Sequence, residues 1–194
     1  MELILVRHGL PVRQELASGR ADPELSAAGR LQAERVADWL HNEGIDAIYT
    51  SPMRRARETA APLATRLSCT PAVHDAIAEY DRAASHYIPM EELKQEDYAA
   101  WKEFVDGGYG DDYDMATFAK TVVAGMEEII TSHPGHRVAA FCHGGVINAW
   151  ASHVLDMRPS LFIDVAYGSI NRFLCASTGQ RNIRSLNETG HLAD

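Results

Sequence analysis

The chain of 194 residues is poor in cysteine. It holds three, Cys69, Cys142 and Cys175, which are widely separated and form no Cys-x-x-Cys pair. A scattered set of this kind indicates neither a disulfide framework nor a zinc or redox site, so we expect reduced cysteines packed in the core. Internal repeats and low-complexity tracts are also missing, and the length suits one domain, residues 1–194, with a sizeable core.

Long hydrophobic runs are missing as well. The first apolar run, residues 3–6, is short, and no stretch of the sequence approaches the ~20 apolar residues that cross a membrane. The first run is also too short for the hydrophobic core of a signal peptide. We therefore expect a soluble, cytoplasmic protein with no membrane partner.

Positive charge is in the minority. The chain has 18 Lys and Arg residues against 27 Asp and Glu residues, which gives a net charge of −9. Nucleic acid is therefore not an expected partner, because binding to its phosphate backbone requires a basic face. A pocket for a phosphorylated ligand must be locally basic, and Arg7, Arg54, Arg55 and Arg57 are placed to supply that charge.

Histidine is plentiful, with 9 residues, but the pattern of a metal enzyme is missing. There is no His-Glu-x-x-His motif and no cluster of acidic residues among the histidines, so we expect neither a metal nor another cofactor. Most of the histidines are interpreted as surface or structural residues, namely His41, His74, His86, His133, His136, His153 and His191.

Two stretches share a sequence pattern that suggests a binding site. Residues 2–9 are an apolar run that ends in Arg-His-Gly, and residues 137–145 are an apolar run that ends in His-Gly-Gly. Each reads as a buried strand with polar groups at its carboxyl end, and ligands bind at that edge of open α/β sheets. We therefore expect His8 and His143 to face each other across one pocket.

The remaining segments alternate between helix and strand patterns. Ser26 is a suitable N-cap for a helix over 27–42, residues 46–50 form a short strand, and Ser51, followed by proline, caps a helix over 53–67. The expected buried stripe of the first helix is Leu31, Val36, Trp39 and Leu40. Later segments are helices over 116–132 and 144–155 and closing strands over 162–166, 169–175 and 182–186, the later ones antiparallel. This order predicts an α/β fold, a three-layer arrangement with a mainly parallel central sheet and helices on both faces.

Three motifs in this order resemble those of a known family. They are Arg7-His8-Gly9, Ser-Pro-Met-Arg-Arg-Ala-Arg-Glu-Thr-Ala at 51–60, and Cys142-His143-Gly144-Gly145. In these motifs the chain is similar to the histidine phosphatase superfamily, the phosphoglycerate-mutase-like enzymes, and within it to the phosphatase branch. Segments 25–33 and 186–192 also resemble the sequence pattern of that family, so the resemblance covers most of the chain.

His8 is the expected nucleophile. A neutral imidazole nitrogen can attack phosphorus and form a phosphohistidine, which divides one difficult displacement into two. Arg7 and Arg55 are expected to hold the phosphoryl oxygens, since each guanidinium is a planar fork of donors. The resemblance selects Arg55 from its segment, and Arg54 and Arg57 are expected on the surface.

His143 is expected to hydrogen-bond the transferring phosphoryl group and to stabilise charge in the transition state. The N–H of Gly144, at a helix start, would add a donor. Gln14 stands where the family often has an asparagine that contacts phosphate, and is a candidate contact. The Leu10-Pro11 pair also departs from the family pattern, which leaves the neighbouring contacts open.

The proton donor is the least defined part of the site. The resemblance implies a Glu in an apolar-x-Glu context, and Glu79 fits. It would protonate the leaving oxygen and then, as a carboxylate, activate water. Asp81 is the alternative donor, and a solvated Glu79 without a catalytic role is a third reading. A phosphate dianion raises the pKa of Glu79 whereas two arginines lower it, so the sequence leaves the direction open.

These residues predict a metal-independent phosphomonoester hydrolase that acts through a phosphohistidine on a small phosphorylated metabolite. The alternatives are a phosphoglycerate mutase and a non-catalytic binder of phosphorylated ligands. A mutase needs extra basic residues over the pocket, and the basic residues within 79–114 are only Arg82, Lys94 and Lys102. A binder would have lost one of the key side chains, which are all present.

The segment 80–114 is acidic, rich in aromatic residues and weakly periodic. We expect it to be an insertion with irregular helices that covers the pocket, where His86 and Tyr87 would touch the substrate. An interface of a homodimer is the other role considered for it.

Overall fold

The computed structural model describes residues 1–107 and 114–193, and its centre is a six-stranded sheet with the order β4-β3-β6-β1-β7-β8. The strands are β1 (Glu2–Arg7), β3 (Ala47–Thr50), β4 (Ala72–Val73), β6 (Arg137–Cys142), β7 (Ile170–Cys175) and β8 (Arg181–Glu188). Neighbours from β4 to β1 pair in parallel, whereas β7 and β8 pair antiparallel. The predicted α/β fold with a mainly parallel sheet is therefore confirmed.

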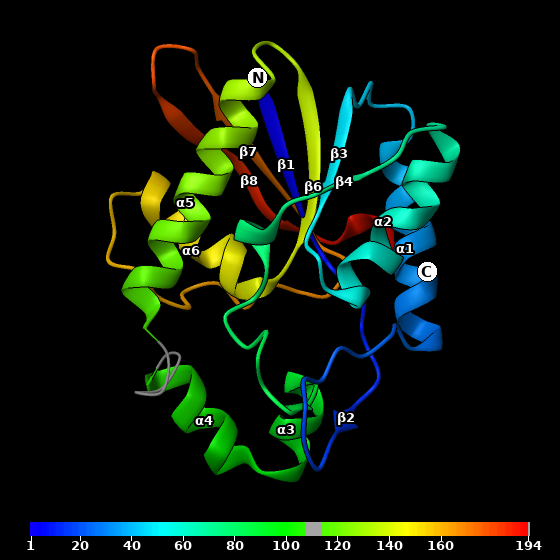
Figure 1. Ribbon diagram of the computed structural model, residues 1–194, viewed down its shortest axis with the longest axis vertical. Coiled ribbons are helices and arrows are strands. Elements are labelled where there is room, and N and C mark those ends of the chain that lie inside the picture. The colour runs from blue at the N-terminus through cyan, green and yellow to red at the C-terminus, as the bar shows by residue number, and fades with distance from the viewer. Residues whose placement is uncertain (108–113, 194) are drawn as a thin grey trace.

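Helices cover both faces of this sheet. They are α1 (Ala27–Leu40), α2 (Arg54–Arg66), α5 (Met115–Ser132) and α6 (Gly144–Val154). Figure 1 shows α1 and α2 on one face and α5 and α6 on the other. Alternation along β1 explains the three layers: Leu3 and Leu5 belong to the core under α5 and α6, and Ile4 and Val6 belong to the core under α1 and α2.

A smaller group of elements lies beyond the carboxyl ends of β1 and β6 (Figure 1). Its members are α3 (Met90–Glu96), α4 (Tyr98–Gly107) and the two-stranded sheet of β2 (Gln14–Glu15) and β5 (His86–Tyr87). The pairing of β2 with β5 connects the loop that follows β1 to the segment predicted as an insertion. Residues 108–113 of that segment lie outside the described residues. The described residues also form two short 3₁₀ helices, η1 (Asp75–Ile77) and η2 (Gly190–Leu192).

The buried face of α1 differs from the expected one. Leu31 and Trp39 are 54% and 51% exposed, so these two members of the predicted stripe were wrong. The buried residues of the helix are Gly29, Ala33, Val36, Ala37 and Leu40. Much of this face is glycine and alanine, and a search for bulky apolar residues misses it because close packing can be achieved with small side chains. Ser26 is the N-cap, as predicted, and its Oγ accepts the N–H of Gly29 at 3.1 Å.

The start of α2 also differs. The N-cap is Met53 and the helix begins at Arg54, so Ser51 is not its cap. The Ser51 hydroxyl accepts the N–H of Met53 at 3.2 Å and also lies 2.8 Å from Nε2 of His143. A residue chosen from the sequence as a cap therefore contacts the second histidine motif.

Residues 162–166 were predicted as a strand, and this prediction was wrong. The side chain of Asn148 satisfies both backbone groups of Ile163, accepting its N–H at 2.9 Å and donating to its carbonyl at 3.0 Å. An asparagine thus replaces the neighbouring strand that these groups would otherwise need.

The cysteines differ in part from the expectation. Cys69 is exposed rather than packed in the core, while Cys142 and Cys175 are buried. Among the described residues, no helix is long and apolar enough for a membrane span.

Gly29 allows the loop after His8 to lie directly on α1. A β carbon at this position would stand 2.1 Å from the carbonyl oxygen of Leu10. We expect Gly29→Ala to lower the free energy of unfolding by about 2 kcal/mol, because the loop must move to relieve the overlap. Chemical denaturation measures this loss. Gly190→Ala is the control: its β carbon meets no atom within 4 Å, and a change of more than about 0.5 kcal/mol there would point to a generic cost of replacing glycine.

Candidate active site

The two histidine motifs meet at the carboxyl edge of the sheet because their strands are parallel neighbours. The register of β1 and β6 pairs Arg7 with Cys142, so His8 and His143 follow at equivalent positions. Their ring centroids are 5.1 Å apart, and the two side chains are 2% and 0% exposed. The structure therefore places both imidazoles together in one buried site.

The hydrogen bonds of His8 define its tautomer. Nδ1 lies 2.8 Å from the carbonyl of Gly9, which can only accept, so Nδ1 carries the proton. The Nε–H of Arg55 donates to Nε2 at 3.2 Å, so Nε2 carries the lone pair. Burial lowers the pKa of His8 well below its usual value, and the charges of Arg55 and Arg7 lower it further. His8 is therefore a neutral imidazole with the lone pair of Nε2 inside the site.

Arg55 is buried in the first turn of α2 and lies between His8 and the covering segment. It is 1% exposed, and its Nη2 donates to Asp81 at 3.4 Å. Its Nη1 is buried and has no hydrogen-bond partner among the described residues. Thr59, one turn along, donates to the Arg55 carbonyl and accepts the N–H of Gly9, which fixes α2 against the loop after β1.

Arg7 reaches the same site from the end of β1. Its Nη1 donates to the carbonyl of Val165. Its guanidinium carbon lies 3.7 Å from the ring centroid of Tyr167, and the guanidinium carbon of Arg55 lies 4.6 Å from that of Tyr87. Each arginine is therefore covered by the face of one tyrosine, which attracts a cation.

His143 is the N-cap of α6 and contacts Ser51 through one of its ring nitrogens. Its Nε2 bonds the Ser51 hydroxyl, and its buried Nδ1 has no partner within the described ranges. Burial, followed by the charges of Arg55, His8 and Arg7, lowers its pKa well below the usual value. Gly144 is the first residue of α6, as predicted, and a β carbon there would lie 3.6 Å from Nε of Arg7.

Glu79 is buried against the start of α6. Its Oε2 accepts the N–H of Gly145 at 2.9 Å, and its Oε1 accepts that of Tyr80 at 3.1 Å. Burial raises its pKa from 4.5 to about 7, with a further increase from Asp81, while the two hydrogen bonds and Arg55 act in the opposite direction. The sequence left the direction of the pKa shift open, and in this structure desolvation outweighs the charge of Arg55. A carboxyl group with this pKa can donate and accept a proton near neutral pH.

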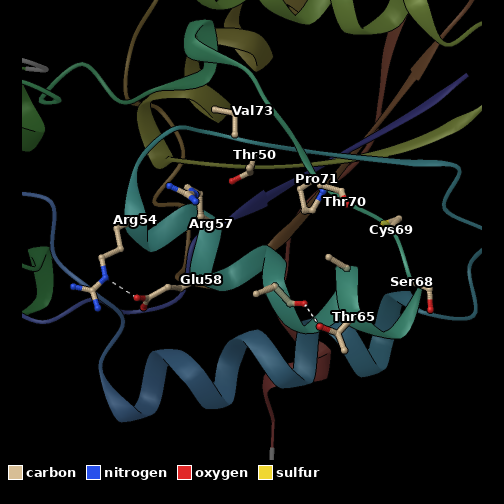
Figure 2. A pocket seen from close by; sticks show the side chains of 12 residues that line it. Thr50, Arg54, Arg57, Glu58, Thr65, Ser68, Cys69, Thr70, Pro71 and Val73 are labelled. Atoms are coloured by element: carbon tan, nitrogen blue, oxygen red, sulfur yellow. Dashed lines mark hydrogen bonds and ion pairs between the residues drawn. The ribbon is translucent and has the colours of Figure 1, made fainter.

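The other candidate residues lie at or outside the edge of the site. Gln14 pairs through its backbone with Tyr87, but its side-chain oxygen accepts the N–H of Asp22. Arg54 and Arg57 are exposed, as expected. Figure 2 shows them lining a groove of about 900 Å³, which follows α2 away from the histidines. The buried histidine site is therefore separate from this groove.

Sequence reasoning missed three residues that shape the site. Ser51 was assigned to a helix cap, and Thr59 and Tyr167 were not considered. Tyr167 precedes β7, which is antiparallel to β1, so the start of β7 lies at the same edge as the end of β1. That topological rule is the signal that would have identified Tyr167.

Within the described residues, no group of three or more His, Cys, Asp or Glu side chains is placed to hold a metal ion.

The fold and the site together define an α/β protein with a buried site that contains two histidines and two arginines. Residues 3–189 match the histidine phosphatase superfamily (branch 1). The chain belongs to this superfamily.

Individual relatives agree with this assignment. A bifunctional protein of Mycobacterium tuberculosis is 29% identical over 202 residues; the alignment covers 98% of this chain and 54% of the relative, so the chain spans about half the length of that relative. Phosphoserine phosphatase 1 of Hydrogenobacter thermophilus is 28% identical over 205 residues, which cover 100% of this chain and 95% of the relative. A crystal structure of an Entamoeba histolytica phosphoserine phosphatase mutant, in complex with phosphoserine, shares the fold with a TM-score of 0.78 at 23% identity, over 99% of each chain.

Proposed function

We propose that this protein is a phosphomonoester hydrolase that transfers the phosphoryl group of a small metabolite to His8 and then to water. The observation that carries the proposal is the state of the site: Nε2 of His8 holds a lone pair, and buried Nη1 of Arg55 and Nδ1 of His143 lack partners within the described residues. Unpartnered buried polar atoms are costly unless a ligand satisfies them. We assign the Ser51 hydroxyl as the donor to Nε2 of His143, which leaves the proton on Nδ1. A tetrahedral phosphoryl group then supplies acceptor oxygens for both Nη1 of Arg55 and Nδ1 of His143.

In the first step, the lone pair of His8 Nε2 attacks phosphorus. The N–P bond forms as the bond from phosphorus to the ester oxygen breaks, and the proton of Glu79 passes to that leaving oxygen. The Nε–H of Arg55, which faces Nε2 in this structure, is released by the attack and turns to a phosphoryl oxygen. Arg7, Arg55 and His143 stabilise the charge that spreads over the other oxygens.

In the second step, the carboxylate of Glu79 removes a proton from water and the water oxygen attacks phosphorus. The N–P bond breaks, its electron pair returns to Nε2, and inorganic phosphate leaves. Glu79 is again protonated, which restores the starting state. A pKa of about 7 suits both roles, since the group must lose and regain a proton in each cycle.

The contacts of the elements beyond the carboxyl ends of β1 and β6 favour a hydrolase over a mutase. Nζ of Lys94 lies 4.4 Å from the ring centroid of Trp101, and Arg13 bonds Glu15 and Glu96, so both cations already have partners among these elements. The acidic group next to Arg55 is Asp81, which disfavours a second phosphate at that edge. We therefore infer that the described part of residues 80–114 is an insertion that covers the pocket of a single domain. Relatives named as phosphoserine phosphatases support a small phosphorylated substrate.

The test is hydrolysis of p-nitrophenyl phosphate and of a panel of phosphorylated metabolites between pH 4 and pH 8, with and without EDTA. We expect turnover that EDTA does not change. Interconversion of phosphoglycerates with a bisphosphate primer would instead identify a mutase. Binding of phosphorylated ligands without turnover of any panel member would identify a non-catalytic binder.

Gly145 provides a prediction for the position of Glu79. A β carbon at this residue would lie 2.3 Å from Oε1 of Glu79 and 2.9 Å from a ring carbon of Tyr80. We expect Gly145→Ala to displace the carboxyl group and to lower kcat/KM by about 10- to 100-fold, as small misplacements of catalytic groups do. Phosphate binding should change much less, because the anion contacts come from other residues. An equal loss of kcat/KM and of phosphate affinity would show that the substitution disrupts the whole site.

A further inference from the structure

Two tyrosines form a layer over the histidine site. The hydroxyl of Tyr87 lies 2.9 Å from that of Tyr167, and both rings lie close to His8, with centroid distances of 6.5 and 5.4 Å. Tyr167 is 5% exposed. Neither residue is needed as a nucleophile, acid or anion ligand in the reaction above, so their arrangement calls for another role.

The tyrosines come from different parts of the fold. Tyr167 precedes Gly168, whose N–H donates to the carbonyls of both Arg7 and His8 at 3.1 Å, so this ring is anchored to the end of β1. Tyr87 lies in β5 of the covering segment, residues 80–114, and β5 pairs with β2 in a separate two-stranded sheet. Their hydroxyl hydrogen bond therefore connects the covering segment to the centre of the site.

Each ring also lies against one of the two arginines. Arg7 is 3.7 Å from the centroid of Tyr167, and Arg55 is 4.6 Å from that of Tyr87. Two guanidinium groups that share one small site repel each other, and a buried arginine side chain has several rotatable bonds. An aromatic face on each guanidinium, with the two rings joined at their hydroxyls, restricts where both groups can lie.

We propose that Tyr87 and Tyr167 act as one coupled pair of positioning residues that holds Arg7 and Arg55 at the spacing required by a phosphoryl group. The proposal rests on the proposed function, because it assigns these arginines to phosphate. Burial raises the pKa of Tyr87 well above its usual value, so its hydroxyl keeps the proton that such a bond requires. The pair preorganises the anion site before substrate arrives, which reduces the ordering that binding would otherwise demand.

A double-mutant cycle tests the coupling. The variants are Tyr87→Phe, Tyr167→Phe and the double variant, each of which keeps both rings and removes only hydroxyl groups. Calorimetric titration with inorganic phosphate measures the Kd. We expect each single change to raise the Kd about fivefold, the effect of losing one hydrogen bond, and the double change to raise it by no more than either single one. Tyr167→Leu, which also removes the ring from Arg7, should raise the Kd by about tenfold or more.

The control is Tyr49→Phe. It removes a tyrosine hydroxyl that bonds Nε2 of His133 at 2.9 Å outside the site, so it should leave the phosphate Kd unchanged. Multiplying effects in the double variant, about 25-fold in total, would show that each hydroxyl acts independently and would overturn the coupling. A fall in Tm with no change in Kd would also overturn it, because the pair would then only stabilise the fold. A wild type that binds no phosphate would refute the proposed function itself, which separates that failure from the other two.

Discussion

Replacement of His8 by alanine is expected to reduce kcat/KM for phosphomonoesters by at least about 10³-fold, because it removes the atom that accepts the phosphoryl group in the proposed mechanism. The remaining arginines would still bind the anion, so the Kd for phosphate should change far less than the turnover. Steady-state kinetics and calorimetric titration separate these two effects. The hydrogen bond from the N–H of Gly9 to Thr59 does not involve the His8 side chain, which loses its contact with Arg55. The variant is therefore expected to remain folded.

His136→Ala is the matched control for this prediction, since His136 is exposed. It should retain wild-type kinetics. Substantial turnover by the His8 variant, with the same pH dependence as the wild type, would mean that another group carries the phosphoryl transfer or that water attacks directly.

Replacement of Glu79 by glutamine is expected to have the second-largest effect. Glutamine cannot release a proton, so kcat/KM for an alkyl phosphate should fall by about 10²- to 10⁴-fold. The loss should be much smaller for p-nitrophenyl phosphate, because its leaving group is stable as an anion and requires little protonation. Comparing kcat/KM for the two substrates measures the contribution of the acid to the first step.

The pH profile gives an independent test of Glu79. Its pKa is raised from 4.5 to about 7, so the acid form predominates below pH 7 and is lost above it. We therefore expect kcat/KM for an alkyl phosphate to decline as the pH rises through about 7, and this decline to disappear in Glu79→Gln. A glutamine variant that keeps the decline would assign it to another group.

Asp81→Asn distinguishes the two carboxyl groups. Asp81 raises the pKa of Glu79, so removal of its charge should move the decline to lower pH without abolishing it. Complete loss of the decline in Asp81→Asn, with Glu79→Gln unaffected, would make Asp81 the proton donor.

The fold was largely predictable because the relevant signals are local. The apolar runs of β1 and β6, each followed by His-Gly, indicated parallel strands that end at one edge, and the structure pairs them in that way. The antiparallel strands at the end of the chain were also confirmed. The errors arose where tertiary contacts replace a local rule: small residues form the buried face of α1, and Asn148 takes the place of a strand beside residues 162–166.

The grouping of the candidate site residues was predictable, but their chemical state was not. The order of the motifs identified His8, Arg55 and His143 as candidates. The tautomer of His8, however, depends on its contacts with the Gly9 carbonyl and the Arg55 guanidinium, which the fold supplies. The direction in which the pKa of Glu79 shifts depends on the burial of its carboxyl group, which no sequence motif specifies. The layer formed by Tyr87 and Tyr167 joins residues that are far apart in the chain, so no sequence spacing predicts it.

The central claim is that His8 carries the phosphoryl group, and trapping tests it most directly. Glu79→Gln protein is mixed with p-nitrophenyl phosphate, quenched at alkaline pH, digested and examined by mass spectrometry. The substitution slows the attack of water, so the intermediate should accumulate. We predict one added phosphoryl group, labile to acid, on the peptide that contains His8. An unmodified His8 peptide during active release of p-nitrophenol, or a phosphoryl group on a different residue, would contradict the account.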